Sequence, residues 1–399
     1  MRKIYLIGIV ALLSAIMVIT PAMAQLTCSY DICVNETGWW RDGGEFNASG
    51  YPDYSIEDAV VNQAADGDTV FIQSGYYHHA GGHDGVISVH TPNLTIIGEG
   101  AEVVTLDFED ISGSDLGLYS GNSVIEGIKI VNSTYGIDVD PDAPDCIIRN
   151  CFFEGLISSF ALDFAVSNIT FANNTIANAT GSQTLVVPIN GSTIVGNTFI
   201  NCPGNAIVLY RQNPAPGGII ARNNITSTGG KGIWLYNAGS GNRIYLNDFV
   251  GNPGGNVVYS GTPPTVIYWN STEQIEYTYG GATYTNYLGN YWSDYNGSDG
   301  DGDGIGNVPY VVYGTDMDYH PLMTKFENYL AAPAGICGDV NKDKSVDFID
   351  VGLVGRHKLY GDPLDDEWAA DVNSDDSIDF IDAGLIGRHK LYGDALNCK

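Results

Sequence analysis

Basic residues are scarce in this sequence. Its 399 residues include 17 lysines and arginines against 47 aspartates and glutamates, which gives a formal net charge of −30. A chain of this charge repels nucleic acids and anionic lipids and attracts cations. The sequence therefore excludes nucleic-acid binding as a function. Long apolar runs are lacking too, because no segment after the first 24 residues is apolar enough to span a bilayer.

Cysteine is also sparse. Seven cysteines are too few for a disulfide scaffold, although an exported chain can oxidise some of them. Cys28 and Cys33 could close a small loop, and we predict a disulfide between Cys337 and Cys398, which bracket the last part of the chain. We expect the others to be buried as small apolar side chains: Cys146, Cys151 and Cys202.

The first 24 residues have the pattern of a cleavable signal peptide. Arg2 and Lys3 precede an apolar run, and the run ends at a small-residue site, Ala22-Met23-Ala24. A membrane anchor is the alternative, but no basic stop-transfer cluster follows. We therefore expect an extracellular protein associated with the cell surface, and its Asn-x-Ser/Thr sequons could be glycosylated.

Between about residues 86 and 261 the sequence repeats with a period of about 24 residues. Each copy has a short strand-like stretch, an asparagine, a Gly/Asn turn and a second stretch. The matched asparagines are Asn150, Asn174, Asn197, Asn223 and Asn247. A short period with β-branched strands indicates a solenoid, because one coil cannot bury its apolar face alone. We predict an all-β, right-handed parallel β-helix, in which the asparagines form a hydrogen-bonded ladder.

Both ends of the repeat region carry further motifs. The segment SIEDAVVNQAADGDTVFIQSGYY starts at Ser55, and its helical spacing over Ile56–Ala65 predicts a cap on the solenoid. The closing segment, residues 286–323, contains NYWSDY, DGDGIG and YHPLM. These motifs and the repeats resemble the NosD-like parallel β-helix family over residues 55–323. The resemblance implies the fold and an extracytoplasmic setting, but no reaction, because this fold hosts lyases, hydrolases, epimerases and binders.

The last part of the chain contains two acidic loops of twelve residues. Each places oxygen-bearing side chains at loop positions one, three, five, seven, nine and twelve, as a calcium loop requires. The predicted ligands of two calcium ions are Asp339, Asn341, Asp343, Ser345, Asp347 and Asp350 in the first loop and Asp371, Asn373, Asp375, Ser377, Asp379 and Asp382 in the second. The twelfth position holds aspartate where glutamate is usual, which shortens the reach of that ligand.

Each loop leads into a helix of nearly the same sequence, VGLVGRHKLYGD or AGLIGRHKLYGD. These paired loop–helix repeats resemble type I dockerins over residues 338–399. The resemblance implies binding to a cohesin module on a scaffold or surface protein, with recognition residues at Phe348, Ile349, Arg356, His357, Phe380, Ile381, Arg388 and His389. We therefore divide the chain into a signal peptide (1–24), a β-helix with cap and closing segment (25–330), a linker (331–336) and a small all-α dockerin (337–399).

The closing segment offers a further cation site. Asp299, Asp301, Asp303 and Asn307 stand at spaced positions in an Asp/Gly loop and could hold a third calcium ion. An ordinary Asp-Gly loop is the alternative.

Two groups on the repeats suggest a carbohydrate site. Superposing GIDV on ALDF places Asp138 one coil from Asp163, about 4.8 Å away, as acid/base catalysis of glycoside hydrolysis could use. Solvated carboxylates without a role are the alternative. Further along the chain, side chains suited to sugar binding are Tyr210, Arg211, Trp234 and Tyr236.

A copper role is not expected. His78, His79, His83 and Asp84 could ligate a transition metal, but no Met/His/Cys cluster suits copper. The sequence thus favours a secreted protein that docks onto a cohesin and binds polysaccharide through its β-helix. A carbohydrate-active hydrolase or epimerase and a structural surface-layer or adhesion protein remain the alternatives.

Overall fold

The protein is described by a computed structural model. It covers residues 28–41, 44–49, 54–78, 86–109, 113, 115–158, 160–164, 166, 168–188, 191–210, 217–226, 229–237, 240–261, 266–329, 336–342, 345–373, 377–392, 396 and 398. The predicted signal peptide and nearly all of the linker lie outside these residues. The chain folds as a parallel β-solenoid of about seven turns followed by a helical C-terminal region. It divides into two compact units, Met1–Val187 and Pro188–Lys399.

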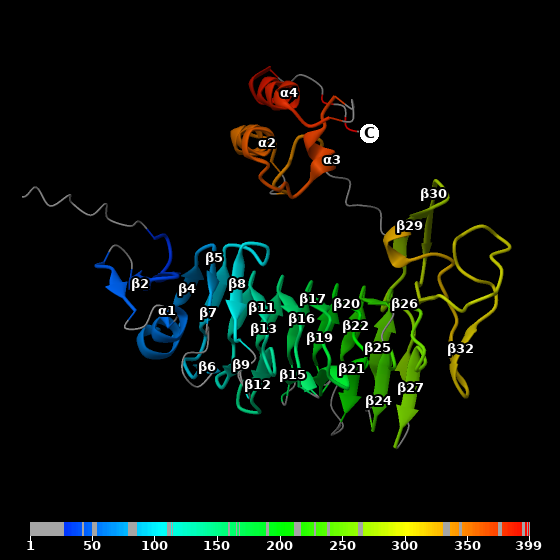
Figure 1. Ribbon diagram of the computed structural model, residues 1–399. Helices are drawn as coiled ribbons and strands as arrows, with labels where there is room; N and C mark the ends of the chain where they lie inside the picture. Colours follow the sequence, from blue (N-terminus) through cyan, green and yellow to red (C-terminus); the bar gives the residue numbers. More distant parts are fainter. Residues whose placement is uncertain are drawn as a thin grey trace, which may run out of the picture. The chain divides into compact units, whose positions relative to one another are not determined.

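In the first unit, successive coils each contribute one short strand to each of three parallel sheets, A, B and C (Figure 1). Sheet A contains β4 (Thr69–Ile72), β7 (Thr95–Gly98), β10 (Val124–Glu126), β13 (Ile147–Arg149) and β16 (Thr170–Ala172). Sheet B contains β5 (Gly75–Tyr77), β8 (Val104–Asp107), β11 (Lys129–Val131), β14 (Phe152–Glu154) and β17 (Thr175–Ala177). Sheet C contains β6 (Val86–Val89), β9 (Asp115–Leu118), β12 (Ile137–Val139), β15 (Phe160–Phe164) and β18 (Gln183–Val187).

The core of this unit consists of columns of apolar side chains. In sheet A, Ile96, Ile125, Ile148 and Phe171 are paired in register from coil to coil, and each is at most 1% exposed. Burial of one such side chain stabilises the fold by about 1.5–3 kcal/mol. Because side chains alternate between the two faces of a strand, the residues between these positions point outward, where functional side chains can lie.

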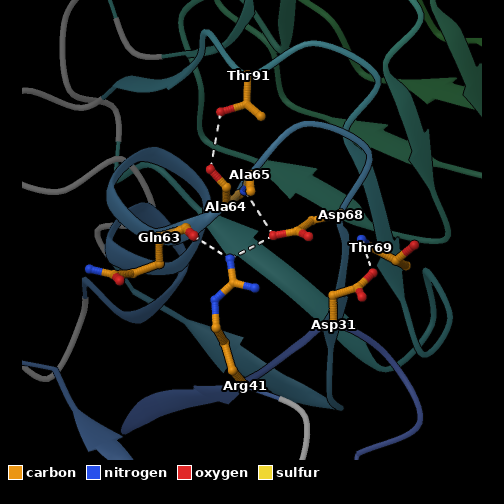
Figure 2. Close-up of polar contacts among 8 residues, drawn as sticks. All are labelled: Asp31, Arg41, Gln63, Ala64, Ala65, Asp68, Thr69 and Thr91. Atoms are coloured by element: carbon orange, nitrogen blue, oxygen red, sulfur yellow. Dashed lines mark hydrogen bonds and ion pairs between the residues drawn. The ribbon is translucent and has the colours of Figure 1, made fainter.

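A cap covers the N-terminal end of this unit. Strands β1 (Ile32–Asn35), β2 (Gly38–Arg41) and β3 (Asn47–Ala48) precede α1 (Ser55–Glu57), which continues as η1 (Asp58–Gln63). The Arg41 guanidinium joins these elements, because it donates to the Gln63 carbonyl at 2.5 Å and to the Asp68 carboxylate at 2.6 Å (Figure 2). The predicted capping helix is thus present, and it ends at Gln63. Cys28 and Cys33 form a disulfide in the same region.

The second unit contains the later coils and the closing segment. Its solenoid strands are β19 (Thr193–Val195), β22 (Ile219–Ala221), β25 (Asn242–Tyr245) and β28 (Ile267–Tyr268) in sheet A; β20 (Thr198–Ile200), β23 (Asn224–Thr226), β26 (Asp248–Val250) and β31 (Tyr291–Trp292) in sheet B; and β21 (Asn205–Tyr210), β24 (Ile233–Tyr236) and β27 (Val257–Ser260) in sheet C. Two antiparallel hairpins follow, β29 (Ile275–Tyr279) with β30 (Ala282–Asn286) and β32 (Tyr310–Tyr313) with β33 (Asp316–Asp318), and then η3 (Phe326–Asn328).

A buried asparagine ladder runs through these coils. The backbone N–H of Asn197 donates to Asn223 Oδ1 at 2.9 Å, and Asn223 donates to Asn247 in the same way at 3.0 Å. The ladder continues through Asn290 and ends on the carboxylate of Asp318, at 3.1 and 2.8 Å. All five side chains are fully buried, so the ladder supplies the hydrogen bonds that the backbone at these turns would otherwise lack.

The prediction that Asn150 belongs to this ladder is wrong. Asn150 is exposed, has a left-handed backbone with φ of 55°, and donates to Glu126 Oε1. Its equivalent in the next coil is Asn173, with φ of 54°, and the residue that faces Asn174 is Cys151, whose N–H donates to Asn174 Oδ1 at 2.9 Å. The alignment was therefore shifted by one residue in this coil.

The C-terminal region contains α2 (Phe348–Tyr360), the short α3 (Glu367–Ala370) and α4 (Phe380–Tyr392), and α2 packs against α4. The apolar core between them is small; its buried residues are Val340, Val354, Ala370, Val372, Ala383 and Ile386. A disulfide joins Cys337 to Cys398 across 61 residues. The remaining cysteines of the chain are buried thiols. At Cys151, burial raises the thiol pKa to about 12, which makes it unreactive.

Candidate functional site

The two loop–helix units of the C-terminal region share one hydrogen-bond pattern. In the first, Asp350 accepts the N–H of Val340 at 2.7 Å through Oδ1 and that of Asp347 at 2.8 Å through Oδ2. In the second, Asp382 accepts the N–H groups of Val372 and Asp379 at 3.0 and 2.9 Å. Both aspartates are fully buried. The twelfth position of each loop therefore closes the loop onto its helix.

This pattern also starts each helix. Asp347 accepts the N–H of Ile349 at 2.7 Å while Asp350 reaches back to Asp347, which is a reciprocal capping box. Asp379 accepts the N–H of Ile381 in the same way. Oδ1 of Asp350 also accepts the N–H of Asn341 at 3.2 Å, which engages both of its lone pairs, whereas Oδ2 of Asp350 and Oδ1 of Asp347 each keep a second lone pair with which they could bind a cation. Of the twelve predicted ligands, Asp343 and Asp375 lie outside the described residues.

The predicted recognition residues lie on the surface at the start of each helix. Phe348, Ile349, Phe380 and Ile381 are 54–58% exposed. Exposure of four large apolar side chains on so small a module is typical of an interaction surface. We call these four side chains the docking surface.

The basic residues further along α2 are engaged within the module. Arg356 Nε donates to Asp362 Oδ2 at 2.6 Å, and His357 Nδ1 lies 2.7 Å from the Asp362 carbonyl oxygen. Sequence reasoning missed three other exposed apolar side chains among the described residues of α2 and α4, of which Tyr360 is the most exposed at 75%; the others are Leu359 and Leu391. The repeated letters KLY in the two helices are the signal that could have found them.

The acidic loop of the closing segment brings three carboxylates together. Oxygens of Asp299, Asp301 and Asp303 all lie within 4.8 Å of one another. Asn307 lies in the same loop, and its amide donates to Asp301 at 3.1 Å. This hydrogen bond lowers the pKa of Asp301. The tyrosine hydroxyls of Tyr277 and Tyr284 in the β29–β30 hairpin donate to carbonyls of the same loop.

A line of carboxylates lies on the outward face of sheet C in the first unit. Asp138 on β12 and Asp163 on β15 are paired in register on neighbouring strands, as the repeat alignment predicted. Burial, and the nearby charge of Asp138, raise the pKa of Asp163 to about 6. Burial likewise raises the pKa of Asp138.

A third carboxylate, Asp115, belongs to the same line and was missed. It lies on β9, two residues before Gly117, which is the in-register partner of Asp138. Asp115 is 7% exposed, and burial together with the charge of Asp138 raises its pKa to about 7. The alternation of polar and apolar residues in DLGL, which starts at Asp115, indicates an outward-facing carboxylate. The position that pairs with Asp138 is Gly117, so an alignment of the repeats does not reveal Asp115.

The aromatic residues predicted to bind sugar lie on sheet C of the second unit. Trp234 and Tyr236 have ring centroids 5.4 Å apart, and Tyr236 is 43% exposed. The Lys231 ammonium lies over the Trp234 ring at 4.6 Å and therefore covers part of it. The side chain of Tyr210 and the whole of Arg211 lie outside the described residues.

A shallow depression near the end of the solenoid was not predicted. It has a volume of about 380 Å³ and is lined by Gly251, Asn252, Pro253, Gly255, Asn256, Ser293 and Asp294. Asn256 donates to the Asp294 carboxylate at 3.0 Å, and the Tyr310 hydroxyl donates to the same group at 3.1 Å. Amide, hydroxyl and carboxylate groups beside an aromatic ring suit a sugar hydroxyl.

Comparison with known proteins gives two family matches. Residues 61–297 match the family described as periplasmic copper-binding protein (NosD). Residues 337–389 match the type I dockerin domain, which implies docking onto a cohesin. No curated protein matches the chain. Within the described residues, no helix is long and apolar enough to cross a membrane.

Copper does not fit the residues that the structure describes. Among these residues, the cluster of acidic side chains close enough to hold a metal ion consists of Asp299, Asp301 and Asp303. Their hard carboxylate oxygens suit calcium or magnesium. His78 is paired with Glu109, and the three thiols are buried. His79, His83 and Asp84 lie outside the described residues. We therefore derive no copper chemistry for this chain.

Several solved structures match part of the chain at low sequence identity. They include the Agl-KA catalytic domain (17% identity, TM-score 0.42, 55% of this chain and 42% of that one). A GH87 α-1,3-glucanase from Streptomyces thermodiastaticus is 18% identical, with a TM-score of 0.38 over 56% of this chain and 40% of that one. The periplasmic alginate epimerase AlgG T265N mutant is 14% identical, with a TM-score of 0.30 over 53% and 66%. This chain thus spans less than two thirds of the length of each of these solved chains.

The NosD family match covers more than half of the chain and contains most of the parallel strands. The dockerin match coincides with the two capped loop–helix units. The chain therefore belongs to the NosD family and carries a type I dockerin domain.

Proposed function

We propose that this protein is a secreted, surface-associated β-solenoid that docks onto a cohesin through its calcium-loaded C-terminal module. The observation that carries the proposal is the pair of identically capped loops, each followed by two exposed apolar side chains. Calcium ions in the two loops would neutralise carboxylates that otherwise repel one another, and thus fix the helices that present the docking surface.

A binding measurement with the full chain tests this proposal. Titration calorimetry against a purified type I cohesin should show tight binding, and replacing all four docking-surface residues by alanine should weaken it by several kcal/mol, as loss of central apolar anchors does. The matched control replaces Val308 and Val311, which are 56% and 55% exposed outside the module. Equal affinity of the docking variant and the control would exclude the proposed surface.

We also propose that the solenoid binds extracellular polysaccharide. The supporting observations are the outward carboxylates of the first unit and, in the second unit, the exposed ring of Tyr236 and the depression that Asn256 and Asp294 help to line. Glycan-array binding that is lost when Tyr236 becomes alanine would support this function. Binding by none of the glycans on the array would leave the structural-protein alternative.

Catalysis by Asp138 and Asp163 is the second candidate for the solenoid. Two carboxylates one coil apart, with raised pKa values, could donate and accept protons at a glycosidic bond. Release of reducing sugar that disappears in Asp138→Asn would establish a hydrolase. Glycan binding by the parent protein without release of reducing sugar would assign the solenoid to binding alone.

The third proposed calcium site uses Asp299, Asp301 and Asp303 in the closing segment. A cation there would neutralise three carboxylates between the solenoid end and the β29–β30 hairpin. Protection of this segment from proteolysis by calcium, lost in Asp301→Asn, is the expected result.

A further inference from the structure

Two of the three carboxylates of sheet C in the first unit, Asp115 and Asp163, lack partners that buried carboxylates need, while the half-buried Asp138 accepts the backbone N–H of Val139. Oδ1 of Asp115 and Oδ1 of Asp163 are buried and accept no hydrogen bond. No lysine, arginine or histidine among the described residues forms an ion pair with Asp115, Asp138 or Asp163. An uncompensated buried carboxylate is costly, so the line is incomplete without a donor that carries positive charge.

The surroundings of the line are shaped by one glycine and one tyrosine. The Tyr119 ring packs against Gly117, and a Cβ atom added to this glycine would lie only 2.7 Å from the ring. Gly117 is the in-register neighbour of Asp138, so the ring lies next to the central carboxylate. Tyr119 also stacks on His90 with centroids 4.7 Å apart. An aromatic ring beside carboxylates suits a ligand with both an apolar ring face and a cation.

The spacing favours a ligand with several charges over one metal ion. The carboxylate oxygens of the sheet C line do not all come within 4.8 Å of one another. Among the described residues, that spacing is found at Asp299, Asp301 and Asp303. Three consecutive coils extend over about 10 Å, which an extended polymer can follow. An ammonium group supplies three N–H donors and a positive charge, which are what these oxygens lack.

We propose that Asp115, Asp138 and Asp163 bind the protonated amino groups of a cationic polysaccharide built from amino sugars. The net charge of −30 disfavours anionic glycans and agrees with this ligand class. The inference deepens the proposal that the solenoid binds polysaccharide, and it rests on that proposal. Binding requires both ionised carboxylates and protonated amino groups, so affinity falls at low pH, where Asp115 gains a proton, and at high pH, where the amino groups lose theirs.

The test is titration of the full chain with a glucosamine tetramer and with the fully N-acetylated tetramer, which has the same sugar ring without the charge. The amine form should bind at least tenfold more tightly. Asp138→Asn should weaken its binding by about 30-fold or more, as removal of one member of a half-buried charge pair does. Asp142→Asn is the matched control, because Asp142 is exposed, follows the same strand and changes the net charge equally.

Asp163→Asn should give a similar loss of affinity for the glucosamine tetramer. This second variant allows the test to be read even if Asp138→Asn alters the fold. Equal binding of the two tetramers would overturn the inference while leaving the solenoid a polysaccharide binder. Binding of neither tetramer would overturn it as well, and failure of every glycan on the array would remove the broader proposal. Calcium chloride binding that Asp138→Asn abolishes, without amine binding, would make the line a metal site instead.

Discussion

At the residue scale, several buried carboxyl groups of the solenoid carry a raised pKa. Burial is the first cause at each of them, and the values reach about 7 for Asp115 and Asp248 and about 6 for Asp163 and Asp318. Hydrogen bonds partly offset the cost of burial at two of them: Asp318 accepts from Asn290, Trp292 and His320, and Asp248 accepts the N–H of Phe326.

These groups predict how stability changes with pH. Their folded-state pKa lies above the unfolded value of about 3.9, so the folded state binds more protons between about pH 4 and 7. The free energy of unfolding should therefore rise as the pH falls from 7 to about 5, with a contribution on the order of 1–2 kcal/mol from each group. Urea denaturation of the solenoid at the two pH values measures this.

Asp163→Asn should be more stable than the parent at pH 7 and should show a smaller change with pH. A free energy of unfolding that falls steadily between pH 7 and 5 would contradict the direction of the pKa shifts.

At the scale of elements, the repeat period predicted the coils, but single positions within a coil could be assigned only where neighbouring coils agreed. Asn150 was assigned to the ladder because Asn-Cys replaces Asn-Asn in its coil, and only the hydrogen bonds show that Cys151 takes the ladder position. Asp115 was missed for a similar reason, since pairing in register is a property of the sheet and Gly117 holds the matched position. The alternation of DLGL places Asp115 on the outward face, but no local signal shows which residue of the next coil lies beside it, and none marks Cys151 as the ladder position.

The ladder itself gives a prediction for one element. Asn223→Ala should lower the free energy of unfolding by about 2–3 kcal/mol, because it removes the side-chain acceptor of the buried Asn197 N–H and the side-chain donor to the Ile194 carbonyl. Asn150→Gly is the control, since Asn150 is exposed and glycine accepts its positive φ; a change within about 0.5 kcal/mol is expected. Similar losses in chemical denaturation would contradict the corrected ladder.

The two loop–helix units are nearly identical in sequence and in capping, so we expect the module to bind its partner in two orientations. If both modes are equal, Phe348→Ala/Arg356→Ala alone should cost only about 0.4 kcal/mol, which is RT ln 2. Phe380→Ala/Arg388→Ala should behave alike, and the combined variant should not bind. Calorimetry in which one pair alone abolishes binding would mean that a single face is used.

At the scale of the whole molecule, the sequence was most informative about domain order. A period of about 24 residues and two calcium-type loops predicted the solenoid and the helical C-terminal module, because stacking and metal coordination both impose strict spacing. Function on the solenoid depends instead on which outward side chains lack partners, and the sequence cannot show that. The docking module is consequently the part of the chain whose function is best supported.

Calcium dependence of docking tests the central claim most directly. The full chain is titrated with a purified type I cohesin by calorimetry, first in calcium and then in excess chelator. We predict that chelation weakens binding by at least about 100-fold and that added calcium restores it, because metal binding supplies folding free energy to the loops. Unchanged affinity in chelator would contradict calcium-dependent docking.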